Sequence, residues 1–169
     1  VPVTAIVDGT DANKVNLTYD HKGLVGNKYD IRLNFAGGSA GEVTPTGVSM
    51  VIVQLANGAT DPSVATAFAI MPAQIFHYIV MPYIGSANLN AADTEMNSRW
   101  SATRMLDGHV FVSDRGTVST VGTLGNTRNN PHMTLFDAGN NSPTPPYIWV
   151  SALVGKVATQ AAVDPALGF

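Results

Sequence analysis

The segment from Gly37 to Gly41 has the spacing of the G-x-S-x-G motif, in which a serine is the nucleophile of a hydrolase. That motif works when the serine stands on a sharp turn from a strand into a helix, because the turn exposes its hydroxyl oxygen. Here Glu42 to Pro45 follow, then an apolar segment typical of a strand, and no helix is predicted. We therefore interpret Gly37 to Gly41 as a flexible glycine loop between strands.

Histidine is the second residue type that could do chemistry, and the chain has His21, His77, His109 and His132. The last three lie in or at predicted strands, where histidines are usually hydrogen-bonded core residues. The sequence has no H-E-x-x-H motif and no close cluster of histidines with carboxylates. It has no cysteine, which excludes a thiol nucleophile, a zinc–thiolate site and a disulfide scaffold. We predict no catalytic residue, no cofactor and no metal ligand.

An enzyme alternative rests on two aspartates. In an open α/β sheet, ligands collect beyond the carboxyl ends of the strands. Asp114 and Asp137 follow predicted strands and could hold Mg²⁺, and the helix start at Thr117 could bind a phosphate. The same loops carry Pro82, Tyr83, Arg115 and Asn140. No dinucleotide or P-loop motif is present, so the favoured interpretation has Asp114 and Arg115 closing a turn and Thr117 as an ordinary helix cap. A Mg- or phosphate-dependent α/β enzyme using Asp114 and Asp137 remains the alternative.

The composition favours a protein that associates with other proteins. Only 12% of the 169 residues are charged and the net charge is −3, whereas globular domains have about 25% charged residues. The nine Lys and Arg residues form no cluster, which argues against a nucleic-acid partner.

The apolar stretch from Tyr147 to Val163 contains Lys156 and several polar residues, so we predict no membrane insertion. The first residues, from Val1 to Thr4, have neither the basic nor the apolar region of a signal peptide, and we expect a fragment or a processed form.

Residues 1–59 are predicted to form a β-rich subdomain. Apolar and polar residues alternate over 15–19 and over 29–35, which is typical of half-buried strands. Residues 22–27 supply the glycines of a hairpin-like turn between them. The continuous apolar run from Val48 to Leu55 favours a strand covered on both faces.

Residues 60–169 are predicted to form an α/β core domain. A first helix is expected from Asp61, with Pro62 at its first position and Val64, Phe68 and Met71 on one face. A second is expected from Asn88, with Leu89, Ala92, Met96 and Trp100 on one stripe. Two more are expected over 117–124 and from Pro145 or Pro146. Strands are expected over 75–80, 109–112 and 132–136. This alternation predicts an α/β class (α+β over the whole chain), with a mainly parallel sheet flanked by helices.

The final helix carries Ile148 and Trp149 on the same half of its surface as Lys156 and other polar residues. Either the two apolar residues tuck under a loop near the helix start, or they form a subunit contact, because exposed large apolar side chains often mark interfaces. The sequence leaves both interpretations open, and Ile148 and Trp149 are its candidate contact residues.

Five segments, in the same order along the chain, are similar to the contractile tail sheath proteins of Mu-like phages. They are Tyr19–Asn27 with the strand Asp30–Asn34, Tyr78–Tyr83, Gly108–Phe111 with Arg115–Thr117 and Leu124–Asn129, Asn141–Pro146 with Trp149, and Asp164–Ala166. The resemblance covers nearly the whole chain, although no single segment is diagnostic.

The resemblance implies a structural subunit of a virion tail and no enzyme, even though the fold of the family's core is called subtilisin-like. Sheath proteins of this kind polymerise around a tail tube and contract to drive it through the host envelope. The implied partners are other copies of the sheath protein, the tail tube protein, and baseplate or terminator proteins, with assembly in the host cytoplasm. Sheath proteins are longer than this chain and link neighbouring subunits through flanking segments, so we expect the present chain alone to be mostly monomeric. A carbohydrate- or receptor-binding module ranks last, because residues 1–59 contain no aromatic platform for a sugar.

Overall fold

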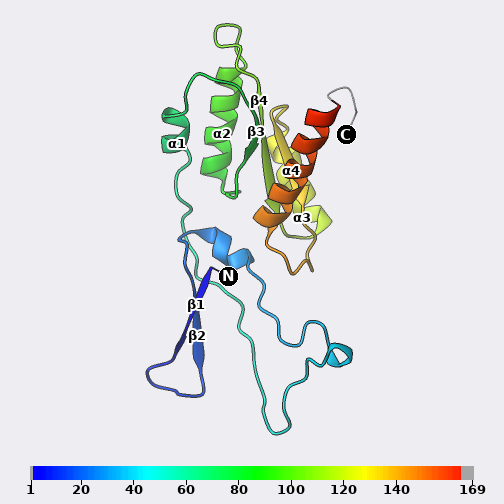
Figure 1. The fold of residues 1–169 in the computed structure, drawn as a ribbon. Helices are drawn as coiled ribbons and strands as arrows, with labels where there is room; N and C mark the ends of the chain where they lie inside the picture. Colours follow the sequence, from blue (N-terminus) through cyan, green and yellow to red (C-terminus); the bar gives the residue numbers. More distant parts are fainter. Residues whose placement is uncertain (1, 165–169) are drawn as a thin grey trace. The chain divides into compact units, whose positions relative to one another are not determined.

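The computed structural model describes residues 2–164 and divides the chain into two compact units, Val1–Ala59 and Thr60–Phe169 (Figure 1). We call them unit 1 and unit 2 and describe each by itself. The final two residues of the sheath-like segment 164–166 lie outside the described residues. Within the described part of the chain, no helix combines the length and the apolar character that a membrane crossing requires.

Unit 1 contains one antiparallel hairpin of strands β1 (Val3–Val7) and β2 (Val15–Tyr19). The strand predicted at 15–19 is confirmed, whereas β1 was missed. The connection is fixed by the carboxylate of Asp8, which accepts hydrogen bonds from the Thr10 amide (2.9 Å) and hydroxyl (2.7 Å) and from Asn16 (2.8 Å). These bonds, led by that from the Thr10 hydroxyl, hold the pKa of Asp8 well below its usual range.

The other β elements predicted in unit 1 are wrong. Residues 22–27 form no hairpin turn; most of them lie in a 3₁₀ helix, η1 (Leu24–Lys28). Residues 29–35 form no strand. The backbone amide of Ile31 donates instead to Oε1 of Gln54 (2.9 Å), and the Ile31 carbonyl accepts from Nε2 of Gln54 (2.7 Å). The run from Val48 to Leu55 is irregular and largely exposed, with Val51 at 89%. A strand needs a neighbouring strand for its backbone groups, and no described segment of unit 1 supplies one here.

Unit 2 is built on a parallel sheet with the strand order β3 (Phe76–Val80), β4 (Gly108–Asp114) and β5 (Met133–Asp137). The α/β class and the parallel arrangement are thereby confirmed, and the three predicted strands are found within a few residues of their expected bounds. The sequence of residues 75–80 is also that of a buried strand, and this expectation is wrong, because β3 lies at the sheet edge and Tyr78 and Val80 stay more than a third exposed.

Helices cover both faces of this sheet (Figure 1). Helix α2 (Ser86–Arg99) packs on the face that carries Val110 and Val112, and α3 (Val118–Arg128) adds Leu124 to the same cluster. Helix α4 (Pro146–Val163) lies against β4 and β3 and buries a separate set of side chains, Pro146, Val150 and Val154. The core positions Leu89, Ala92 and Met96 on α2 are confirmed, whereas Trp100 is 64% exposed.

Two helix starts and one helix end differ from the predictions. Helix α1 (Ala65–Ala69) is short and begins after Val64, so Asp61 does not cap it and Pro62 precedes its first turn. The buried amide of Asn88 on α2 takes over this role: its Oδ1 accepts from the Val64 amide and its Nδ2 donates to the Pro62 carbonyl, both at 3.0 Å. Helix α2 starts two residues before Asn88, and α3 extends four residues beyond Leu124. A helix end satisfied from another helix gives no local sequence signal.

Candidate functional site

The carboxyl edge of the sheet brings together the two aspartates of the enzyme alternative. Asp114 and Asp137 are register partners at the ends of β4 and β5. Oδ1 of Asp137 accepts from the Gly139 amide (2.8 Å) and closes a local turn. Oδ1 of Asp114 accepts from the amide of the adjacent Arg115 (2.7 Å), a bond between neighbouring residues. The guanidinium of Arg115 donates to the Ser142 carbonyl (2.6 Å) and so ties the next loop to the same edge.

The remaining features of this edge are structural in the same way. The hydroxyl of Thr117 accepts from the Thr120 amide (3.2 Å), as predicted for a helix cap. Tyr83 packs against the core, while Pro82 and Asn140 are exposed. Within residues 2–164, no three His, Asp or Glu side chains are grouped so that they could hold a metal ion. The geometry therefore lends no support to the Mg-dependent enzyme alternative.

The G-x-S-x-G segment lies in unit 1, where Gly38–Ala40 form the short 3₁₀ helix η2. It has no strand before it and no α-helix directly after it, so the strand-to-helix turn of a hydrolase is not formed. The predicted loop is thus found, although the flanking strands are not. Ser39 is exposed, and no described histidine hydrogen-bonds to it.

Three histidines gather at the opposite, amino edge of the sheet. His77, His109 and His132 line a pocket of about 350 Å³ together with Trp100 and Asp107. His109 is hydrogen-bonded through Nε2 to the Thr134 hydroxyl (2.8 Å), and the ring of His132 lies 5.2 Å from that of Trp100. Sequence reasoning placed these histidines in strands but missed that they meet. The signal was available, because each stands at the start of one of three parallel strands, and such starts share one edge.

Burial lowers the pKa of His109, and the neighbouring His132 lowers it further, against a smaller opposite effect of Asp107. The folded state therefore favours the neutral imidazole. Because the folded pKa of His109 lies below the ordinary value of 6.5, the contribution of this histidine to the stability of unit 2 is fully present above pH 6.5 and is lost as the pH falls through the folded pKa. The groups that face His109 in the pocket are His77, Asp107 and His132.

We expect the melting temperature of the chain to decrease as the pH is lowered below about 6.5, where the unfolded histidine takes up its proton more readily than the folded one. The variant His109→Gln, which keeps a hydrogen-bonding group beside Thr134, should flatten this fall when unfolding is followed by circular dichroism. The exposed His21 in unit 1 provides the matched control, since His21→Gln should leave the pH profile unchanged. A profile that is as steep in His109→Gln as in the parent chain would contradict this account.

Ile148 and Trp149 occupy the first turn of α4, just after Pro145 and Pro146 as predicted. The indole nitrogen of Trp149 donates to the hydroxyl of Ser142 (2.7 Å), which fixes the ring beside the preceding loop. Even so, 44% of Trp149 and 45% of Ile148 remain exposed. The two residues are therefore held in place and still partly free for contact with another surface.

Comparison with known proteins identifies the family. Residues 57–167 match the phage tail sheath protein central domain. Over 166 residues, 98% of its length, the chain is 35% identical to the Mu-like prophage FluMu tail sheath protein of Haemophilus influenzae, and it spans about one third of that relative. The predicted resemblance to a viral tail sheath protein of a bacteriophage or prophage is confirmed, and the chain belongs to the phage tail sheath protein family.

Proposed function

We propose that this chain is the core of a subunit that polymerises around a phage tail tube and contracts to drive the tube through the host envelope. Membership of the sheath family is the observation that carries the proposal. The proposed partners are further copies of the subunit, the tail tube protein, and baseplate or terminator proteins, with assembly in the host cytoplasm. The role is mechanical, with no chemical reaction assigned to any side chain.

The proposed source of work is a difference in free energy between two packings of the subunits. The sequence carries no P-loop or dinucleotide motif through which a nucleotide could supply energy. A contact between two different surfaces of identical subunits does not close on itself and produces a helical array. If the array has two stable packings, the subunits can switch together from one to the other. We further propose that residues 1–59 and 60–169 act as distinct subdomains of the subunit.

Ile148 and Trp149 are the proposed subunit contact on α4. Their partial exposure and the hydrogen bond from Trp149 to Ser142 support a fixed, apolar contact point, and tryptophan is enriched among residues that dominate binding energy.

We expect the double variant Ile148→Ser, Trp149→Ser of the full-length subunit to raise the concentration needed for polymerisation by at least roughly tenfold. Pelleting by ultracentrifugation measures this concentration. A matched variant is Val118→Ser, on an exposed position of α3, which should polymerise as the parent does. Equal pelleting of all three proteins would remove Ile148 and Trp149 from the contact, and failure of the parent protein to polymerise under any condition would count against the sheath function itself.

A further inference from the structure

The outer face of α4 is a stripe of small and apolar side chains that also carries Ser151 and Thr159 and has one charge. Its exposed positions include Ile148, Trp149 and Ala152 near the start and Val163 at the end, and Val163 is 78% exposed. Lys156 stands in the middle of this stripe and is the sole charged residue of the helix. No ion pair joins its ammonium group to another side chain within residues 2–164. A helix face of this length with exposed Ile148, Trp149 and Val163 and a single cation is suited to packing against another protein surface.

The pocket at the amino edge of the sheet has the opposite charge. Asp107 is the one acidic residue that lines it, and its Oδ1 accepts a hydrogen bond from the Gly108 amide (2.8 Å). Asp107 has no ion-pair partner in the part of the chain that the structure describes. His109 is neutral at pH 7, because burial lowers its pKa. The pocket therefore presents the carboxylate of Asp107 beside the indole of Trp100.

Trp100 gives this pocket a second means of holding a cation. Its indole is 64% exposed and stands on the pocket wall beside His132. The face of an indole attracts an ammonium or guanidinium group more strongly than the face of any other side chain. A carboxylate and an indole that line one hollow are thus complementary to a lysine side chain.

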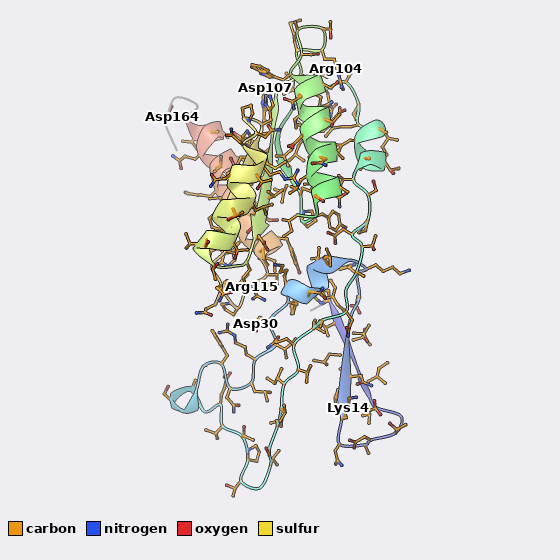
Figure 2. The ribbon with its side chains drawn as sticks, turned by 180° about the vertical axis from the view of Figure 1, so that it is seen from behind. Lys14, Asp30, Arg104, Asp107, Arg115 and Asp164 are labelled. Atoms are coloured by element: carbon orange, nitrogen blue, oxygen red, sulfur yellow. The ribbon has the colours of Figure 1, made fainter. Side chains whose placement is uncertain are left out.

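The walls of the pocket are fixed by the buried Arg99 next to Trp100. Its guanidinium donates to the carbonyls of Pro72 (3.2 and 3.3 Å) and Gln74 (3.0 Å), and its own carbonyl accepts from the Leu106 amide (2.8 Å). These bonds tie the end of α2 to both loops that lead into strands β3 and β4. Figure 2 labels Asp107 and Arg104 at this end of unit 2 and Arg115 at the opposite end. A rigid site binds with a smaller entropic cost than a mobile one.

We propose that the pocket at Asp107 and Trp100 receives Lys156 from α4 of a second copy of this chain. The inference rests on the proposed sheath function, which supplies many identical copies. It places the outer face of α4 over the amino edge of the neighbouring sheet. The same helix carries the proposed contact residues Ile148 and Trp149, so these residues and Lys156 belong to one surface of α4. The outer face of α4 on one copy and the pocket on the next are different surfaces. A contact between different surfaces extends into a helical array instead of closing as a dimer.

A charge exchange in the full-length subunit tests this pairing. Asp107 and Lys156 are both exposed in the single chain, so the variants Asp107→Lys and Lys156→Asp should fold as the parent does, which circular dichroism verifies. Each single variant should raise the critical concentration for polymerisation by at least roughly tenfold, because a close charge pair at an interface becomes a repulsive one. The double variant Asp107→Lys, Lys156→Asp should return it to within about threefold of the parent value. Lys22→Asp, an equal charge change at an exposed lysine of unit 1, is the control and should have no such effect.

Carbodiimide cross-linking of the unaltered polymer provides a second, independent readout. Polymers grown from mixed ¹⁴N- and ¹⁵N-labelled subunits should yield a mixed-isotope peptide pair that joins Asp107 to Lys156. The proposal is overturned if a parent protein that polymerises gives no such product, or if the double variant is no better than the single ones. If the parent protein does not polymerise at all, the result contradicts the proposed sheath function. A polymer without the Asp107–Lys156 product contradicts only the proposed pairing, so the two outcomes are distinguished.

Discussion

We expect the replacement of Arg99 by alanine to lower the free energy of unfolding of unit 2 by roughly 3–5 kcal/mol. Arg99 is 1% exposed, and its guanidinium bonds to the carbonyls of Pro72 and Gln74 while lying 5.5 Å from the ring of Phe76. Its carboxylate neighbour Glu95 is 3.8 Å away, which is too far for a hydrogen bond. The carbonyl bonds are therefore the main interactions that alanine would remove, leaving two loop carbonyls without their donor.

Tryptophan fluorescence during guanidinium unfolding measures this effect, because Trp100 and Trp149 both belong to unit 2. Arg104 provides the matched control, since it also bonds to Glu95 (3.1 Å) but its side chain is 34% exposed. Arg104→Ala should lower the free energy of unfolding by no more than about 1 kcal/mol, as is usual for an exposed ion pair. Arg99→Met, which keeps the apolar stem, should fall between the two. A loss below about 1 kcal/mol in Arg99→Ala would show that the carbonyl bonds do not stabilise this end of the unit.

We expect Leu89→Ala to destabilise unit 2 by about 2–5 kcal/mol, the usual cost of emptying a core leucine site. Leu89 is 1% exposed and packs from α2 onto the central strand with Ala92, Met96, Val110 and Val112. It also borders a hollow of about 290 Å³ with Val112 and Leu124. Because Leu89 already borders this hollow, few neighbouring atoms could move in to fill the volume that the leucine side chain leaves. We therefore expect a destabilisation in the upper half of the 2–5 kcal/mol range, about 4 kcal/mol.

The same unfolding measurement applies to two comparison variants. Leu89→Met nearly conserves the side-chain volume and should cost less than about 1.5 kcal/mol. Val118→Ala removes methyl groups from a site on α3 that is 82% exposed, and the result should lie within about 0.5 kcal/mol of zero. If Leu89→Ala and Val118→Ala have equal effects, the assigned core of unit 2 is wrong.

The architecture of unit 2 could be predicted because its signals are local. The stripe of Leu89, Ala92 and Met96 and the cap at Thr117 each fall within a few turns of one element, and the structure contains both. Alternation of strands and helices then implies the parallel sheet. The start of α1 could not be predicted in this way, because Asn88, which satisfies it, lies on another helix.

The β-rich reading of unit 1 failed for a related reason. An alternating or apolar run predicts strand propensity, but a strand forms only where a second strand supplies backbone partners. Residues 15–19 found that partner in Val3–Val7, whereas 29–35 and 48–55 found none within the described chain. Gln54 shows what occurs instead, since its side-chain amide occupies the backbone donor and acceptor of Ile31.

The candidate site was predicted in its parts and not in its arrangement. The residues Asp114 and Asp137 were correctly placed at one sheet edge, and each accepts a hydrogen bond from a nearby backbone amide. The shared edge of His77, His109 and His132 follows from their positions at the starts of three parallel strands, whereas their closeness to Trp100, at the end of α2, needed the three-dimensional structure. Family membership came from the order of several weak segments along the chain, which no single residue pattern could provide.

Electron microscopy of the full-length subunit, alone and with its tail tube protein, tests the sheath function most directly. The account predicts helical tubes or stacked rings that surround the tube protein, in two packings of different length. The present chain alone should remain mostly monomeric under the same conditions. A full-length protein that stays monomeric and ignores the tube protein at every concentration would contradict the account.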